Sequence, residues 1–268
     1  MTHFTDPFID PAIHTRIEAE LDAIEREQGV RIVLAIESGS RAWRFPSRDS
    51  DYDVRFLYMC PVQGYLTVGS PRDVIERPVD AVFDVSGWDL RKAFQLGLRA
   101  NAVLVEWLTS PVRYREVGPA AGRLLDFMRA HADLTGLAYH YDRQARRMFD
   151  EVLAAGAPRL KAYCYALRSA LALLWLRRFR APPPMDLPAL LAGLDLPAET
   201  VAVIGDLVAR KLPSVERDTG PRLPVLDTLV GGILAEPVQW MGRDEPRHEA
   251  ARQADALFAD LVLNAYGP

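Results

Sequence analysis

The sequence predicts an α+β protein, in which a domain with a mixed sheet and flanking helices is followed by an all-helical domain. Two observations support this prediction. Short β-branched runs alternate with helical patterns between residues 31 and 100, whereas every long apolar pattern after Leu134 repeats at helical spacing. Pro and Gly residues punctuate residues 110–135. The predicted domains are therefore residues 1–120 and 121–268.

The first predicted element is an amphipathic helix, because apolar residues recur every three to four positions from Ile13 to Ile24 and Gly29 follows as a stop signal. Residues 31–38 ("RIVLAIES") then contain a continuous apolar run over residues 32–36 that is rich in β-branched side chains. Such a run is typical of a strand that is covered on both faces. This strand ends at Gly39 and Ser40.

Two more strands are predicted in the first half of the chain. Residues 51–60 alternate between charged and apolar side chains over most of their length, as a strand with two different faces does. Residues 81–90 form the other strand, which leads into a helix over residues 89–100. Asp89 is suited to cap this helix.

The second half of the chain contains long helical patterns. Residues 134–156 and 160–179 each carry one, a Pro-rich break follows at residues 181–188, and a further helix is clearest over residues 249–266. A cleft between the two halves is the expected place for a site.

Composition narrows the functional classes. The formal net charge of −4 argues against a protein that coats nucleic acid through bulk charge, although a local basic groove is compatible with it. No apolar run reaches the length of a membrane span, and no leader segment is evident. We expect a cytoplasmic protein without a membrane partner, and the oligomeric state stays open.

Two carboxylates lie at the start of the second predicted strand. Asp51 and Asp53 project to the same side, roughly 7 Å apart from the strand rise. Hard divalent ions prefer oxygen ligands, and Mg²⁺ takes one or two carboxylates together with substrate phosphates. In a two-metal site, one ion activates the attacking oxygen and the other stabilises the leaving group. The pair therefore predicts a site for hard divalent ions such as Mg²⁺ and for a nucleotide.

The turn before this pair is suited to an anion. Gly39 has no side chain, so its backbone can approach phosphate oxygens closely, and Ser40 adds a hydroxyl donor. A short helix starting at "RAWRF" would direct free N–H groups at the same anion. The turn and the carboxylates would then bind one triphosphate from two sides.

A third carboxylate is expected to complete the metal site, and there are two candidates. Asp84 lies within the third predicted strand, where an unpaired carboxylate is unusual. Asp89 begins the following helix, where capping alone explains it. Asp84 is favoured, and Asp89 stays as the alternative.

These motifs together resemble those of a known superfamily. A strand ending in Gly-Ser, Asp-x-Asp a dozen residues later and one more Asp on a later strand resemble the nucleotidyltransferases related to DNA polymerase beta. More narrowly, "ESGSRAWRFPSRDSDYDVRFLY", "DVSGWDLRKAF", "NAVLVEWLTSPVRY" and "LKAYCYALRSALALLWL" resemble the predicted nucleotidyltransferases associated with RNA-ligase repair operons. The resemblance covers about residues 30–185.

The resemblance implies a fold, an activity and a set of site residues. The fold is a five-stranded mixed sheet with flanking helices and a carboxy-terminal helical domain. The activity is the transfer of a nucleotidyl group from a nucleoside triphosphate such as ATP, with Mg²⁺ or Mn²⁺. By position, Gly39 and Ser40 fall on the phosphate-binding turn, Asp51 and Asp53 on the metal-binding pair, and Asp84 on the third carboxylate.

One residue departs from the family pattern. Arg44 stands where Gly is the commoner residue of the family. This difference leaves the metal assignment intact but makes the conformation of the loop an open point.

Several basic residues are candidates for phosphate contacts. Arg41 is the best placed, because it is nearest to the turn, and Lys92 and Lys161 are further candidates for nucleotide binding. Lys161 and Arg168 lie two helical turns apart, on one predicted helix face. The competing interpretation for each of these residues is a solvated surface charge.

The acceptor and the class of activity stay open at this level. RNA ends or tRNA, protein hydroxyls and small molecules are all compatible acceptors. The competing classes are a non-catalytic nucleotide-binding or interaction module and a toxin-like nucleotidyltransferase with the same fold. The discriminating feature is whether Asp84 or Asp89 can approach Asp51 and Asp53.

Overall fold

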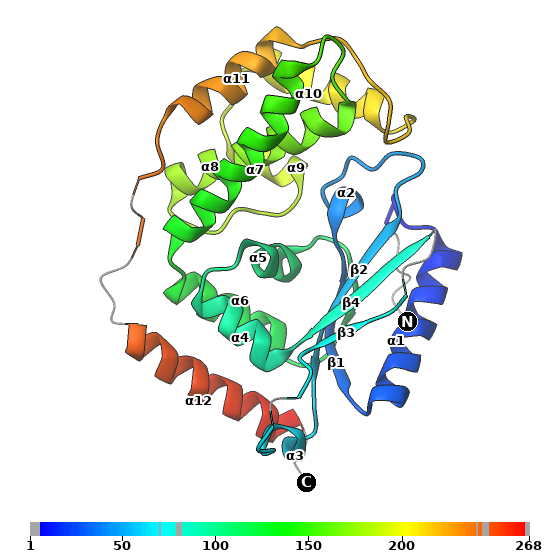
Figure 1. Cartoon of the computed structure of the whole chain (residues 1–268), viewed down its shortest axis with the longest axis vertical. Helices are drawn as coiled ribbons and strands as arrows, with labels where there is room; N and C mark the ends of the chain where they lie inside the picture. The colour runs from blue at the N-terminus through cyan, green and yellow to red at the C-terminus, as the bar shows by residue number, and fades with distance from the viewer. Residues whose placement is uncertain (1–5, 70, 79–81, 240, 243–246, 266–268) are drawn as a thin grey trace. The chain divides into compact units, whose positions relative to one another are not determined.

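The computed structural model describes residues 6–69, 71–78, 82–239, 241–242 and 247–265, without the side chain of Arg247 (Figure 1). Internal contacts divide the chain into two compact units. Unit 1 comprises Met1–Arg41, Asp51–Ala132 and Arg243–Pro268, and unit 2 comprises Ala42–Ser50 and Asp133–Gly242. The predicted single boundary after residue 120 does not reproduce this division. The chain enters unit 2 once for a nine-residue loop and again for the helices, and its end returns to unit 1.

Unit 1 is built on a mixed sheet, as the sequence predicts. Within the described residues it has five strands: β1 (Arg31–Glu37), β2 (Tyr52–Met59), β3 (Val74–Glu76), β4 (Phe83–Asp89) and β5 (Arg113–Glu116). Their order is β3-β4-β2-β1-β5. β2 pairs in parallel with β4, and the other neighbours are antiparallel. Local patterns indicate the positions of β1, β2 and β4 only, whereas the family resemblance implies five strands without locating β3 and β5.

Helix α1 (Pro11–Gln28) covers one face of this sheet. The carboxylate of Asp10 accepts a hydrogen bond from the N–H of Ala12 at its start, and Gly29 ends it in a left-handed conformation with φ 61°. The buried apolar side chains of α1 pack in one core with those of β1, β2 and β4. The predicted helix and the buried strand after it are both confirmed.

Three helices that follow one another along the chain cover the other face of the sheet (Figure 1). They are α4 (Leu90–Leu98), α5 (Ala102–Thr109) and α6 (Ala120–His131). Asp89 caps α4 as predicted, with its Oδ1 atom 2.7 Å from the N–H of Arg91. Trp107 of α5 stacks on Trp88 of β4 with ring centroids 3.8 Å apart. Residues 110–135, whose Pro and Gly residues indicate a boundary between domains, instead contain β5 and α6.

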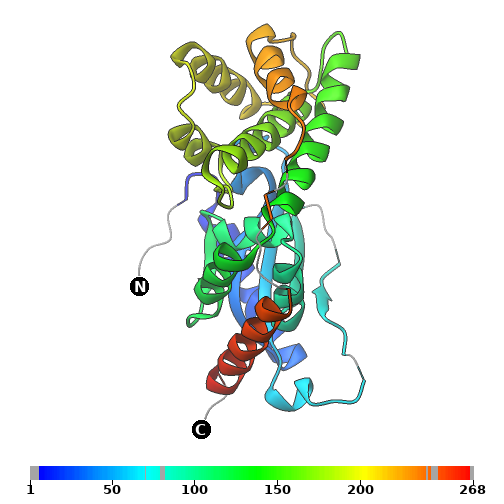
Figure 2. The same cartoon turned by 90° about the vertical axis from the view of Figure 1, so that its left-hand side faces the viewer.

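The last helix, α12 (Arg247–Ala265), belongs to unit 1 rather than to the helical half. Figures 1 and 2 show it alongside α4 and α6. Phe258 contacts the rings of Tyr65 and Phe94, with centroids 5.0 and 5.8 Å apart, and Arg123 pairs with Asp260. Tyr65 ends the short helix α3 (Val62–Tyr65). Aromatic packing thus anchors α12 on the rest of unit 1.

Unit 2 is helical. Its described helices are α7 (Leu134–Ala154), α8 (Leu160–Phe179), α9 (Leu187–Gly193), α10 (Ala198–Lys211) and α11 (Pro224–Ala235). Helix α8 lies at its centre, with 13 of its 20 side chains buried. Among all the described helices, none combines the length and the apolar character that a membrane span requires.

The loop at residues 42–50 packs within unit 2. Trp43 meets the ring of Tyr165 edge-on, with centroids 4.8 Å apart, and the guanidinium of Arg168 lies 4.5 Å from the Trp43 ring. Asp49 accepts a hydrogen bond from the N–H of Glu216 at 3.0 Å. The basic loop between Gly-Ser and Asp-x-Asp is therefore a part of the helical unit.

Candidate functional site

The strand register of unit 1 brings two of the predicted carboxylates together. Asp53 of β2 and Asp84 of β4 are direct partners in the parallel pairing, so their side chains share one face of the sheet. Val54 and Val85, which alternate with them, lie in the core that includes α1. Asp53 and Asp84 therefore point away from α1. Asp51 immediately precedes β2 and is exposed.

The alternative third carboxylate lies at the other end of β4. Asp89 pairs in register with Tyr58, five residues beyond the Asp53 and Asp84 pair, or roughly 16 Å along the strands. Besides capping α4, it accepts a hydrogen bond from the hydroxyl of Tyr65 at 2.9 Å. Of the two candidates, geometry brings only Asp84 beside Asp53; its role as a metal ligand stays a prediction.

Arg55 bridges the two carboxylates. Its Nη2 atom lies 3.0 Å from Asp53 Oδ1 and 2.6 Å from Asp84 Oδ2. Its Nη1 atom donates to the backbone oxygens of Asp84 and Val54, at 2.7 and 3.1 Å. The Arg55 side chain is 16% exposed, against 25% for Asp53 and 32% for Asp84. The strand alternation predicts that Arg55 shares the face of Asp53, but it gives no indication of this bridge.

The Gly-Ser turn packs directly against Asp53. Gly39 starts the short helix α2 (Gly39–Ala42) and has φ 59°, a conformation that favours glycine. A Cβ atom at Gly39 would lie 2.1 Å from Asp53 Oδ2, which is closer than atoms can approach. The N–H of Ser38 also donates to the carbonyl of Asp53 at 2.8 Å. The turn and the carboxylate are thus one packed feature.

A buried glutamate supports this feature. Glu37 Oε1 accepts a hydrogen bond from the N–H of Asp53 at 3.0 Å, and its Oε2 accepts one from the hydroxyl of Tyr114 at 2.6 Å. Burial raises the pKa of Glu37 from its ordinary 4.5 to about 8, although these two hydrogen bonds lower it. At neutral pH Glu37 therefore carries a proton and adds no charge beside Asp53.

Glu37 is absent from the predicted site residues, although the sequence contains a signal for it. It is a polar residue at the last position of an otherwise apolar strand, next to the Gly-Ser turn. A carboxyl at such a position needs hydrogen-bond partners, and those partners come from β2 and β5. The partner on β5 could not be found from local patterns.

Arg41 lies at the turn, as predicted, and is held by backbone and aromatic contacts. Its Nε donates to the carbonyl of Asp51 at 3.1 Å and its Nη1 to that of Phe8 at 2.9 Å. Its guanidinium lies 3.8 Å from the ring centroid of Tyr52. Arg41 thus ties the turn to the start of the carboxylate strand.

Geometry does not bring Lys92 to the carboxylates. Lys92 lies on α4, beyond Asp89, and its Nζ pairs with Asp73 at 2.9 Å. The parallel register separates this end of β4 from Asp84, and the nucleotide contact of Lys92 stays a prediction.

The two basic residues predicted on α8 belong to unit 2. Lys161 pairs with Glu216 at 2.7 Å and lies 5.5 Å from the ring of Tyr165. Arg168 is 1% exposed, and its Nε donates to the carbonyl of Met185 at 2.9 Å. Arg168 therefore packs in the interior of the helical unit. The nucleotide contact of Lys161 stays a prediction.

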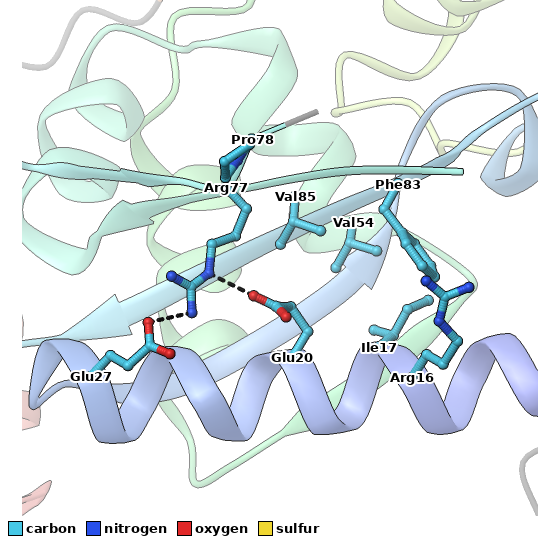
Figure 3. A pocket seen from close by; sticks show the side chains of 9 residues that line it. All are labelled: Arg16, Ile17, Glu20, Glu27, Val54, Arg77, Pro78, Phe83 and Val85. Atoms are coloured by element: carbon cyan, nitrogen blue, oxygen red, sulfur yellow. Dashed lines mark hydrogen bonds and ion pairs between the residues drawn. The ribbon is translucent and has the colours of Figure 1, made fainter. Parts of the chain in front are cut away.

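A cavity on the opposite face of the sheet is a separate feature. It has a volume of about 480 Å³ between α1 and the strands, and Val54, Val85 and Phe83 are among its lining residues (Figure 3). Arg77 reaches into it and pairs with Glu20 at 2.6 Å and with Glu27 at 2.7 Å. Arg77 thus pairs with two carboxylates on the face that Asp53 does not share.

The carboxylates fit a divalent ion that phosphates help to hold. Asp53 and Asp84 offer hard oxygen donors from adjacent strands, both partly open to solvent. In the part of the chain that the structure describes, no cluster of three or more His, Cys, Asp or Glu side chains forms a metal cage. Two carboxylates and substrate phosphates are the set that Mg²⁺ commonly uses.

Comparisons with known proteins find similar sequences over most of the chain. Residues 13–260 match the family model described as "RNA repair pathway DNA polymerase beta family". "Uncharacterized protein YcgL" of Bacillus subtilis (strain 168) is 40% identical over 215 residues, which cover 80% of this chain and 83% of that protein. A crystal structure of a nucleotidyltransferase-like protein from Exiguobacterium sibiricum 255-15 is 14% identical, covers 93% of this chain and 90% of that chain, and has a TM-score of 0.33. The family match includes the carboxylates, the turn and the helices of unit 2.

Proposed function

This chain belongs to the RNA repair pathway DNA polymerase beta family, and from that premise we propose that it is a metal-dependent nucleotidyltransferase. It transfers a nucleoside monophosphate from a nucleoside triphosphate to an acceptor hydroxyl and releases pyrophosphate. The observation that carries the proposal is the pairing of Asp53 with Asp84 across β2 and β4, with the Gly39 turn packed against Asp53.

The residues have separate tasks in this reaction. The turn at Gly39 and Ser40 binds the triphosphate through backbone N–H groups and the Ser40 hydroxyl. Asp53 and Asp84 would hold Mg²⁺ or Mn²⁺ together with the substrate phosphates, with Asp51 at the start of β2 as a further candidate ligand, and the ion would neutralise charge at the phosphates. Glu37 fixes the backbone of Asp53 without adding negative charge.

The chemical step is a displacement at phosphorus. The acceptor oxygen bonds to the α-phosphorus, the bond from that phosphorus to the bridging oxygen breaks, and pyrophosphate leaves with the electron pair. The proton of the acceptor hydroxyl passes to the carboxylate of Asp84 and then to solvent. Because the reacting groups are held by the turn and the strands, positioning supplies a large part of the rate enhancement.

The acceptor that we propose is a hydroxyl of RNA. The support is the family description, which places these proteins in an RNA repair pathway. Protein and small-molecule acceptors are tested in the same experiment.

The experiment incubates the full chain with each α-labelled nucleoside triphosphate and Mg²⁺ or Mn²⁺, offering total RNA, total protein and a small-molecule extract as acceptors. We expect label on RNA, and loss of at least about 100-fold of the transfer in Asp53→Asn and in Asp84→Asn. Asp73→Asn, which removes a half-exposed carboxylate of the same unit, should keep the wild-type rate. Transfer that persists in the first two variants, or its absence with every nucleotide, contradicts the proposal.

A further inference from the structure

Arg55 lies between the carboxylates that the proposed function assigns to a divalent ion. One nitrogen, Nη2, contacts both Asp53 Oδ1 and Asp84 Oδ2, at 3.0 and 2.6 Å. A guanidinium cannot lose its charge in a protein, so this cation is permanent. The three side chains together carry a net charge of −1 rather than the −2 of two adjacent carboxylates.

The guanidinium has two differently bonded halves. Nη1 donates to the backbone carbonyls of Asp84 and Val54, one on each of the paired strands. Nη2 alone contacts the carboxylates. A divalent ion therefore competes with Nη2 only, while Nη1 keeps the side chain anchored to the sheet.

We propose that Arg55 is the resident counter-ion of this site. It holds Asp53 and Asp84 together while no metal is bound. When a divalent ion binds, Nη2 gives up its contacts with the two carboxylates, and their oxygens become available to the ion. This inference rests on the proposed function, because it takes Asp53 and Asp84 as the metal ligands. Arg55 thereby acts as a positioning residue that sets the affinity for metal.

One consequence concerns the order of binding. The cation of Arg55 lowers the affinity of the bare protein for a divalent ion, since like charges repel at short range. A triphosphate adds oxygen ligands to the ion and offers the released Nη2 a phosphate partner. Metal and nucleotide therefore bind together far better than metal binds alone.

The test measures binding of Mn²⁺ alone to the full chain, from the electron paramagnetic resonance signal of the free ion. We expect Arg55→Gln to bind Mn²⁺ roughly tenfold more tightly than the wild type, because it removes a positive charge beside the ligands. Arg77→Gln is the matched control, since Arg77 also pairs with two carboxylates, on the other face of the same sheet. Its Mn²⁺ affinity should equal that of the wild type.

A second readout separates metal binding from folding. Without metal, Arg55→Gln should melt at a lower temperature than the wild type, and saturating Mn²⁺ should raise its melting temperature by more than it raises that of the wild type. Arg77→Gln should lose stability without this larger gain from Mn²⁺. If Arg55→Gln does not fold, Arg55→Met serves the same comparison, because it keeps a long unbranched side chain without the charge.

The outcomes distinguish the two proposals. Mn²⁺ binding that is equal or weaker in the Arg55 variant overturns the counter-ion role. If Asp53→Asn abolishes Mn²⁺ binding in that same experiment, the proposed metal site itself still holds. Absence of Mn²⁺ binding in the wild type and in every variant, with and without a nucleoside triphosphate, overturns both.

Discussion

Substitution of Gly39 by Ala is expected to damage the site in two separable ways. Gly39 has φ 59°, which an L side chain adopts at a cost. In addition, the new Cβ would lie 2.1 Å from Asp53 Oδ2 and 3.0 Å from its Cγ. The carboxylate must therefore move, because contacts below about 3 Å between such atoms are repulsive.

The two effects differ in size. The left-handed conformation alone costs about 1 kcal/mol of the free energy of unfolding. Relief of the clash adds about 1 to 3 kcal/mol, as overpacking does elsewhere. Relief also displaces Asp53 by about 1 Å, and a displacement of this size costs about 100-fold in rate when the group positions a reaction.

Urea unfolding and the label-transfer assay measure these effects independently. Gly29→Ala is the matched control, because Gly29 also has a positive φ, 61°, while no other described part of the chain comes within 4 Å of the place that its Cβ would take. Gly29→Ala should lose about 1 kcal/mol of stability and keep its activity. The reasoning is refuted if Gly39→Ala is as stable and as active as Gly29→Ala.

Three further predictions follow from the described contacts. Arg44 has φ 74°, so Arg44→Gly should be more stable to urea than Arg44→Ala by about 1 kcal/mol, the reverse of the usual order in helices. Between pH 4.5 and about 8 the folded state holds a proton on Glu37 that the unfolded state has lost, so the free energy of unfolding falls as pH rises through this window. The Glu37→Gln variant cannot titrate at this position. Over the same pH window its free energy of unfolding, measured by urea titration at each pH, should therefore fall by about 4 kcal/mol less than that of the wild type. Asp84→Asn should abolish label transfer, whereas Asp89→Asn should lower the melting temperature and keep most of the activity.

Each of these three predictions has an outcome that would contradict it. Equal stability of the Gly and Ala variants at Arg44 would mean that the loop does not hold a left-handed residue there. Parallel pH profiles for the wild type and Glu37→Gln would place the proton elsewhere. Loss of activity in Asp89→Asn without loss of stability would return the third carboxylate to that position.

Local sequence patterns predict the helices and strands that are specified by a single continuous segment of the chain. The helix that ends at Gly29 and the apolar helix α8 both have a continuous repeat, and capping marks the start of α4 at Asp89. The Gly-Ser turn and Asp-x-Asp were found because their chemistry depends on spacing along the chain. The preference for Asp84 over Asp89 rests on the cost of an unpaired carboxylate inside a strand.

Features that depend on contacts between distant segments could not be found in this way. The parallel register of β2 and β4 decides that Arg55 bridges Asp53 and Asp84 and that Lys92 lies at the far end. The hydrogen bond from Tyr114 to Glu37 joins residues that are 77 positions apart. Short strands such as β3 and β5 carry too few residues for a periodic signal.

The alternation of the two units along the sequence affects how the gene can be divided. Residues 42–50 belong to the helical unit, yet they connect Arg41 of the turn directly to Asp51 of the carboxylate strand. A gene fragment that encodes only the sheet would thus carry Trp43 without the helix on which it packs, and would also lack α12. Because the two units alternate along the sequence, no single cut in the gene separates them. Recombination that keeps both units folded is therefore expected to keep their coding sequences together.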